Sequence, residues 1–230
     1  MGRMAGPLWC VETGDGPPLV LLHGNGESHR VFDRMVAPLA PRHRLVALDS
    51  RGHGATPRGE APLTIARMAD DVDGALAELG LTGVDVLGFS DGGNVALELA
   101  LRHPRRTGRL VVVGANLSPE GLTARTLAEV RVVHAALQAA GRVVPAARRA
   151  AERWALMADQ PRIDPSDLRR VGVPTLVVVG ARDVVRPEHT RLIADRLPLA
   201  RVAVVPRAGH MLPLTHPREL AALVEAFLEP

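Results

Sequence analysis

Apolar residues recur along this chain in two patterns that alternate over most of its length. Short runs rich in valine and leucine, bounded by glycine or proline, predict strands at residues 8–13, 19–23, 44–48, 84–89, 110–113, 175–180 and 201–205. Between them, apolar residues three or four apart predict helices, most clearly over residues 64–79, where Gly80 supplies a stop. Runs such as LVLL and TLVVV are apolar on both faces, as in parallel strands covered by helices on each side. We therefore expect an α/β fold with a mostly parallel sheet.

One segment interrupts the alternation of strand and helix. Residues 115–170 contain two helical patterns, at 122–138 and 145–157, with no strand pattern between them. We interpret 115–170 as a short helical cap inserted over the edge of the sheet, and residues 1–114 together with 171–230 as one core. A chain of 230 residues is long enough for a single α/β domain with a sizeable core.

Amino-acid composition and charge limit the kinds of partner that the chain is expected to bind. The sequence pI is about 10.6, yet the net charge is only +3, because all 28 basic residues are arginines, whose high pKa inflates the pI. They are scattered among carboxylates, so we expect a solvated surface and no nucleic-acid partner. No apolar run approaches the length of a signal peptide core or a membrane span, which predicts a cytoplasmic protein without a membrane partner. Cys10 is the sole cysteine, so no intrachain disulfide can form.

The sequence GFSDG, residues 88–92, stands where a strand pattern changes to a helix pattern. Glycines on both sides of Ser90 allow a sharp turn that lifts the serine hydroxyl clear of the sheet. Backbone N–H groups at the start of the following helix, Asp91 first, face any negative charge that develops on an attacked carbonyl. Ser90 is therefore a candidate nucleophile.

A nucleophilic serine needs a base, an orienting acid and a second oxyanion donor. Asp183 follows the strand pattern TLVVVG, and His210 follows RVAVVP, so both fall at the sheet edge that carries Ser90. The loop HGNGE, residues 23–27, offers the N–H of Asn25 as the second donor, although an ordinary strand-to-helix loop explains it equally well by itself. Two neighbouring polar residues, His23 and Asp49, are better explained as structural hydrogen-bonding groups in tight turns.

Five motifs in order carry a family resemblance: HGNGE, LDSRGHG (48–54), GFSDGGN (88–94), PTLVVVGARD (174–183) and AGHMLPLTHP (208–217). With them the chain resembles the α/β-hydrolase fold family over nearly its whole length. The resemblance implies that Ser90 is the nucleophile, His210 the general base and Asp183 the acid, with Asn25 and Asp91 supplying oxyanion N–H groups. Two features depart from the family: a single strand pattern, 8–13, precedes the HG strand where a hairpin is usual, and the cap is short.

The expected reaction is hydrolysis of a small carboxylic ester or related acyl compound through an acyl-enzyme. Cofactor-free haloperoxidases (perhydrolases) and carbon–carbon bond hydrolases share the serine triad and stay open as alternatives. A small-molecule receptor that keeps the triad without turnover is the alternative of another class. The chain has no HExxH, GxGxxG or GxxxxGK[ST] pattern, so we expect neither a metal nor a nucleotide cofactor.

Candidate substrate contacts are Asp91, Leu117, Trp154, Met157 and Met211, although such apolar residues are more often plain core. Asp91 admits two interpretations. Its carboxylate is favoured at a helix N-terminus whatever the substrate. Alternatively, GFSDGG resembles the elbow of valacyclovirase-like hydrolases, in which the residue at this position helps to hold the α-amino group of amino-acid esters.

Overall fold

A computed structural model describes residues 2–229 of the chain. Its centre is one eight-stranded sheet with the strand order β1-β2-β4-β3-β5-β6-β7-β8. The strands are β1 (Arg3–Ala5), β2 (Leu8–Thr13), β3 (Pro18–Leu22), β4 (Arg44–Asp49), β5 (Val84–Phe89), β6 (Thr107–Val113), β7 (Thr175–Gly180) and β8 (Ala200–Val205). The helices are α1 (Asp33–Leu39), α2 (Ile65–Glu78), α3 (Asp91–Arg102), α4 (Ala124–Gly141), α5 (Pro145–Ala158), α6 (Pro187–Arg196), α7 (Leu212–Thr215) and α8 (Pro217–Leu228).

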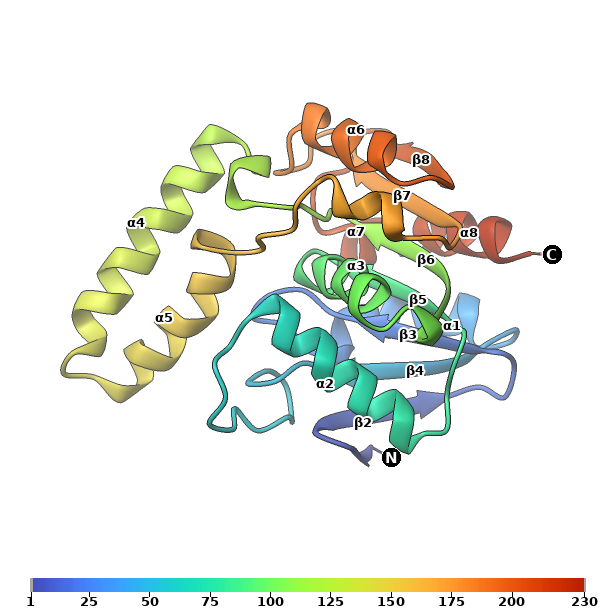
Figure 1. The fold of residues 1–230 in the computed structure, drawn as a ribbon, viewed down its shortest axis with the longest axis horizontal. Helices are drawn as coiled ribbons and strands as arrows, with labels where there is room; N and C mark the ends of the chain where they lie inside the picture. Colours follow the sequence, from blue (N-terminus) through green and yellow to red (C-terminus); the bar gives the residue numbers. More distant parts are fainter. Residues whose placement is uncertain (1, 230) are drawn as a thin grey trace.

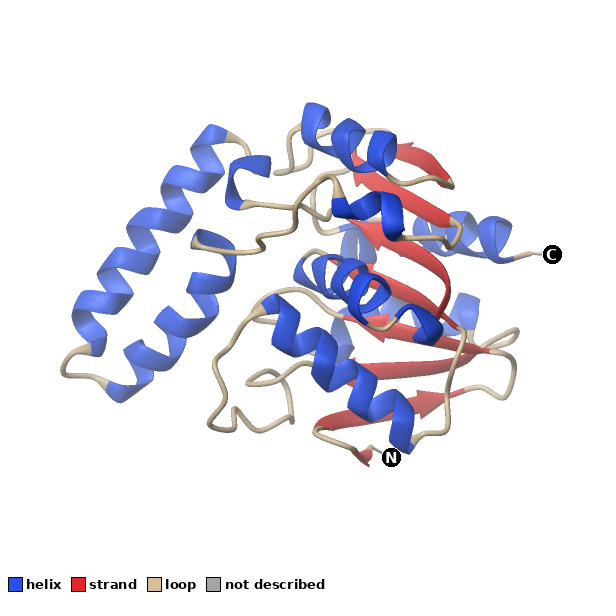
Figure 2. Cartoon of the chain, viewed as in Figure 1, coloured by secondary structure: helices blue, strands red, loops and turns tan. Residues whose placement is uncertain are grey.

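The predicted α/β class is confirmed, because helices cover both faces of a mostly parallel sheet (Figures 1 and 2). Strand β3 shows how the sequence achieves this. Val20 and Leu22 join the buried cluster that contains α2 and α3, whereas Leu19 and Leu21 join the cluster that contains α1 and α8. Successive side chains of a strand point to opposite faces, so an unbroken apolar run fills both cores.

The structure contains one strand that the sequence did not predict, and another that begins earlier than predicted. A short strand β1 pairs antiparallel with β2, with Arg3 opposite Cys10, so the hairpin that the sequence analysis found incomplete is present. Strand β6 begins at Thr107, three residues before the predicted 110–113, and Thr107 pairs with Val84. Its polar start is stabilised because the Arg109 guanidinium contacts the Asp85 carboxylate at 2.8 Å. A three-residue edge strand and a polar strand start carry no apolar run, which is why the pattern missed both.

Helices α4 and α5 pack against each other and project from one end of the sheet (Figure 1). The first begins at Ala124, two residues later than predicted, because the Thr123 side chain accepts a hydrogen bond from Thr126 N–H and caps the helix. We call this α4–α5 unit the helical pair. Within residues 2–229, no helix combines the length and the hydropathy that a membrane crossing requires.

Candidate active site

The turn between β5 and α3 is as tight as the GFSDG pattern requires. Ser90 adopts φ 54° and ψ −121°, a strained backbone conformation for a residue with a Cβ. A Cβ on Gly92 would collide with the backbone oxygen of Leu22, and a Cβ on Gly88 would collide with the backbone oxygen of Gly92. The glycines are thus needed because backbones cross here at contact distance, and the crossing raises Ser90 above the sheet.

Ser90, His210 and Asp183 form one hydrogen-bonded chain. The Ser90 Oγ lies 2.9 Å from His210 Nε2, and His210 Nδ1 lies 2.7 Å from Asp183 Oδ1. Burial of Asp183 opposes its ionisation. The hydrogen bond and charge of His210 outweigh this effect, together with the N–H groups of Val185 and Gly180, and lower the pKa of Asp183. An ionised Asp183 therefore holds the imidazole with Nε2 facing the serine.

The HGNGE loop lies directly against the nucleophile. A Cβ on Gly24 would sit 3.0 Å from the Ser90 Cβ, so the loop backbone passes beside the serine. Within residues 2–229, the backbone N–H groups of Asn25 and Asp91 donate to no protein acceptor. An oxyanion hole requires two N–H groups without an acceptor, and one is available in the loop that passes Ser90 and one directly after Ser90 in the chain.

The side chains behind these N–H groups form a buried amide network that sequence reasoning missed. Asn25 Nδ2 donates to Asp91 Oδ2 at 2.9 Å and to the backbone oxygen of Arg153 at 2.7 Å. Asn94 Nδ2 contacts Asp91 Oδ1 at 3.4 Å and Asn116 Oδ1 at 3.3 Å. Burial raises the pKa of Asp91 to about 7, although these donors favour its ionised form. The network ties the HGNGE loop, the elbow helix and α5 together.

The two polar residues set apart from the triad have structural roles, as predicted. His23 is buried, and its Nε2 accepts the Ser50 N–H at 2.9 Å. Asp49 is fully buried and accepts the backbone N–H groups of His29 at 2.7 Å and Ala55 at 2.8 Å. Both side chains fix turns at the carboxyl edge of the sheet. Within the described chain, His, Cys, Asp and Glu side chains form no group of three that could hold a metal ion.

A cavity of about 270 Å³ opens in front of Ser90 and His210, which we call the catalytic cavity. Its other walls are Asp91, Gly114, Asn116, Leu122, Thr126, Glu129, Val130, Trp154, Met157 and Val184. Of the four apolar residues suggested as substrate contacts, Trp154 and Met157 of α5 line it. The other two do not: Leu117 is buried in the core beneath α3, and Met211 packs on the opposite core at the start of α7. Both lie next to site loops in sequence, but their side chains face the cores.

Known proteins resemble the chain in sequence and in fold. The model of the alpha/beta hydrolase fold family matches residues 17–131, half of the chain. A pimeloyl-[acyl-carrier protein] methyl ester esterase of Aeromonas hydrophila is 31% identical, covering 94% of this chain and 96% of that protein. A 2-hydroxymuconate semialdehyde hydrolase of Pseudomonas sp. is 30% identical, covering 94% and 88%.

A solved structure gives the same result for the fold. The bromoperoxidase of Bacillus anthracis superposes with a TM-score of 0.84 over 100% of both chains, at 20% identity, which speaks for the fold alone. The strand order, the elbow and the family match agree with each other. This chain belongs to the α/β-hydrolase fold family.

Proposed function

We propose that the chain is a serine hydrolase that cleaves a small carboxylic ester through an acyl-enzyme, with Ser90 as nucleophile. The observation that carries the proposal is the unbroken hydrogen-bonded chain from Asp183 through His210 to Ser90, opening on a cavity. An esterase relative at 31% identity over almost the whole chain supports the same reaction class.

In the proposed mechanism each group has a step. Ser90 Oγ attacks the ester carbonyl while His210 Nε2 takes its proton, and the imidazolium is stabilised by the Asp183 carboxylate. The N–H groups of Asn25 and Asp91 receive the oxyanion. His210 then returns the proton to the leaving alcohol, and afterwards activates a water molecule that releases the acid and regenerates Ser90.

The catalytic cavity favours a small, largely apolar group next to the reacting carbonyl. Leu122, Val130, Trp154, Met157 and Val184 supply the apolar part of its walls. About 270 Å³ is at the lower limit of common ligand pockets, so a short acyl chain fits and a bulky one does not. In this proposal residues 115–170, which contain the helical pair, are the cap over the site.

A second candidate is hydrolysis of a carbon–carbon bond. The 30% identity to a 2-hydroxymuconate semialdehyde hydrolase supports it, and the same serine, histidine and oxyanion donors would serve. The two reactions differ in the leaving group, which is an alkoxide for an ester and a carbanion for a carbon–carbon bond. If the protein cleaves a vinylogous 1,5-diketone and turns over no ester, the second candidate is the correct one.

A panel of p-nitrophenyl acyl esters graded by chain length tests the first candidate. We expect multiple turnovers with a maximum at short uncharged chains, and a loss of roughly 10³-fold or more in kcat for Ser90→Ala. Circular dichroism of that variant should match the unmodified protein. Near-normal turnover by the purified, folded Ser90→Ala protein would refute the assignment.

A further inference from the structure

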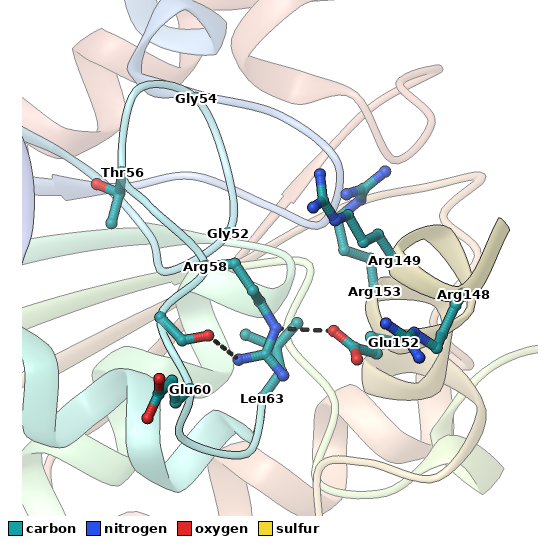
Figure 3. Close-up of a pocket in the computed structure, with 11 residues that line it drawn as sticks. Gly52, Gly54, Thr56, Arg58, Glu60, Leu63, Arg148, Arg149, Glu152 and Arg153 are labelled. Carbon is teal, nitrogen blue, oxygen red and sulfur yellow. Dashed lines mark hydrogen bonds and ion pairs between the residues drawn. The ribbon is translucent and has the colours of Figure 1, made fainter. Parts of the chain in front are cut away.

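A second cavity, of about 600 Å³, lies between α5 and the loop of residues 52–63 (Figure 3). We call it the arginine cavity. The charged residues that line it are Arg58, Arg148, Arg149, Arg153, Glu60 and Glu152. Four guanidinium groups face two carboxylates, so the walls carry a net positive charge of two.

Of the four arginines that line the arginine cavity, Arg58 forms an ion pair with a carboxylate of the cavity. Arg58 Nε contacts Glu152 Oε2 at 2.7 Å, and its other nitrogens donate to backbone oxygens of the loop. Within residues 2–229, the guanidinium groups of Arg148, Arg149 and Arg153 form no ion pair. Arg149 and Arg153 are four residues apart on α5, and Figure 3 shows them extending to the same side of the helix. This face of the cavity therefore offers two adjacent planar cations with free donors.

A third cavity, of about 350 Å³, adjoins both the arginine cavity and the catalytic cavity. It shares Arg153 with the former and shares Trp154 and Met157 with the latter. Each cavity borders a row of α5 residues spaced four apart, Arg149, Arg153 and Met157, and we call the surface along this row the α5 groove. A helix rises 1.5 Å per residue, so Arg153 lies about 6 Å and Arg149 about 12 Å beyond Met157 along this groove.

We propose that the arginine cavity binds an oxyanion group, a carboxylate or a phosphate, at the far end of one arm of the substrate. The inference rests on the proposed ester hydrolysis and names its substrate class: esters with a distal anion. Guanidinium groups recognise both anions through paired N–H donors. An extended chain gains roughly 1.2 Å per bond, so about ten bonds span the distance of about 12 Å from the Met157 wall of the catalytic cavity to the level of Arg149.

Matched esters test the proposal. The first series consists of p-nitrophenyl esters whose acyl arm ends in a carboxylate, a phosphate or a neutral carboxamide, with arms of about four and about ten bonds. The second series consists of alkyl esters that carry the same arms on the alcohol. The readout is the ratio of kcat/KM between anionic and neutral esters of equal length. The test variant is Arg149→Gln/Arg153→Gln, which keeps the Arg153 backbone oxygen that accepts from Asn25. The control, Arg191→Gln/Arg196→Gln, removes the same charge from α6, outside all three cavities.

We expect a preference of roughly 10-fold for the long anionic arm in at least one series, and little for the short arm. It should fall toward unity in the test variant, persist in the control, and shrink with added salt. The carboxylate and phosphate series show which anion is preferred. Neutral esters hydrolysed with no anionic preference, or a preference lost equally in both variants, would overturn this inference alone. No ester turnover at all would overturn the proposed function and the inference with it.

Discussion

Asp91 connects the electrostatics of the site to the stability of the fold. The residue is 7% exposed, and burial raises the pKa of its carboxyl from 3.8 to about 7, with Glu27 adding to the rise and Asn25 and His210 opposing it. A carboxyl with a raised pKa binds its proton more tightly in the folded chain than in the unfolded chain. The stability contributed by this proton is complete below pH 4 and is lost as the pH rises through about 7.

The size of the Asp91 pKa shift sets the expected change in the free energy of unfolding. About three pKa units correspond to about 4 kcal/mol, of which about 3 kcal/mol is lost between pH 5 and pH 8. Asp91→Asn cannot ionise and keeps an oxygen that can accept from Asn25. Urea unfolding of both proteins at the two pH values measures the effect. The stability of the variant minus that of the unmodified protein should be about 3 kcal/mol larger at pH 8 than at pH 5.

A surface carboxyl provides the control for this measurement. Asp195 of α6 is exposed, so Asp195→Asn should change stability by the same amount at both pH values. If the difference for Asp91→Asn is also constant between pH 5 and pH 8, burial does not hold the Asp91 proton. The amide donors Asn25 and Asn94 would then outweigh burial and keep Asp91 ionised, which would contradict the raised pKa.

The other predictions concern catalysis, specificity and packing. Asp183→Asn should lower kcat by roughly 10³-fold or more with the fold intact, measured by ester hydrolysis and circular dichroism; unchanged kcat would contradict the triad. Both Asp91 oxygens already accept amide N–H groups, so kcat/KM should not favour an α-amino-acyl ester over its des-amino analogue; a preference lost in Asp91→Asn would reverse that interpretation. Gly92→Ala should prevent folding or lower the midpoint of thermal unfolding sharply, because the new Cβ has no room against the backbone of β3. A midpoint within a few degrees of that of the unmodified protein would contradict this close approach of the two backbones. Arg51→Met should destabilise by about 3 kcal/mol in urea, because it leaves the buried Asp71 carboxylate without its 2.6 Å partner; a change under 1 kcal/mol would show that other groups compensate.

The elements that the sequence predicted are those with strong local signals. Buried parallel strands need apolar runs, and the elbow needs glycines at fixed positions, so β5, the elbow and α3 could be located from residues 84–102 alone. Asp183 and His210 were found because each follows an apolar strand at one edge of the sheet. That geometry comes from the parallel topology itself.

What the sequence could not show depends on contacts between distant segments. The Asn25 side chain reaches Arg153, 128 positions away, and no periodicity encodes such a pair. Leu117 and Met211 lie next to site loops in sequence, but whether a side chain turns toward a cavity or a core is decided by packing. The α5 groove likewise exists because the helical pair folds back beside the loop of residues 52–63.

Stoichiometric labelling tests the central claim, that Ser90 is the nucleophile of the hydrolase, most directly. The protein would be treated with one equivalent of a fluorophosphonate, assayed for ester turnover, and digested for mass spectrometry. The account predicts one adduct per chain, located on Ser90, with turnover lost in proportion to labelling. Full turnover after complete labelling of Ser90, or inactivation with the adduct on another residue, would contradict it.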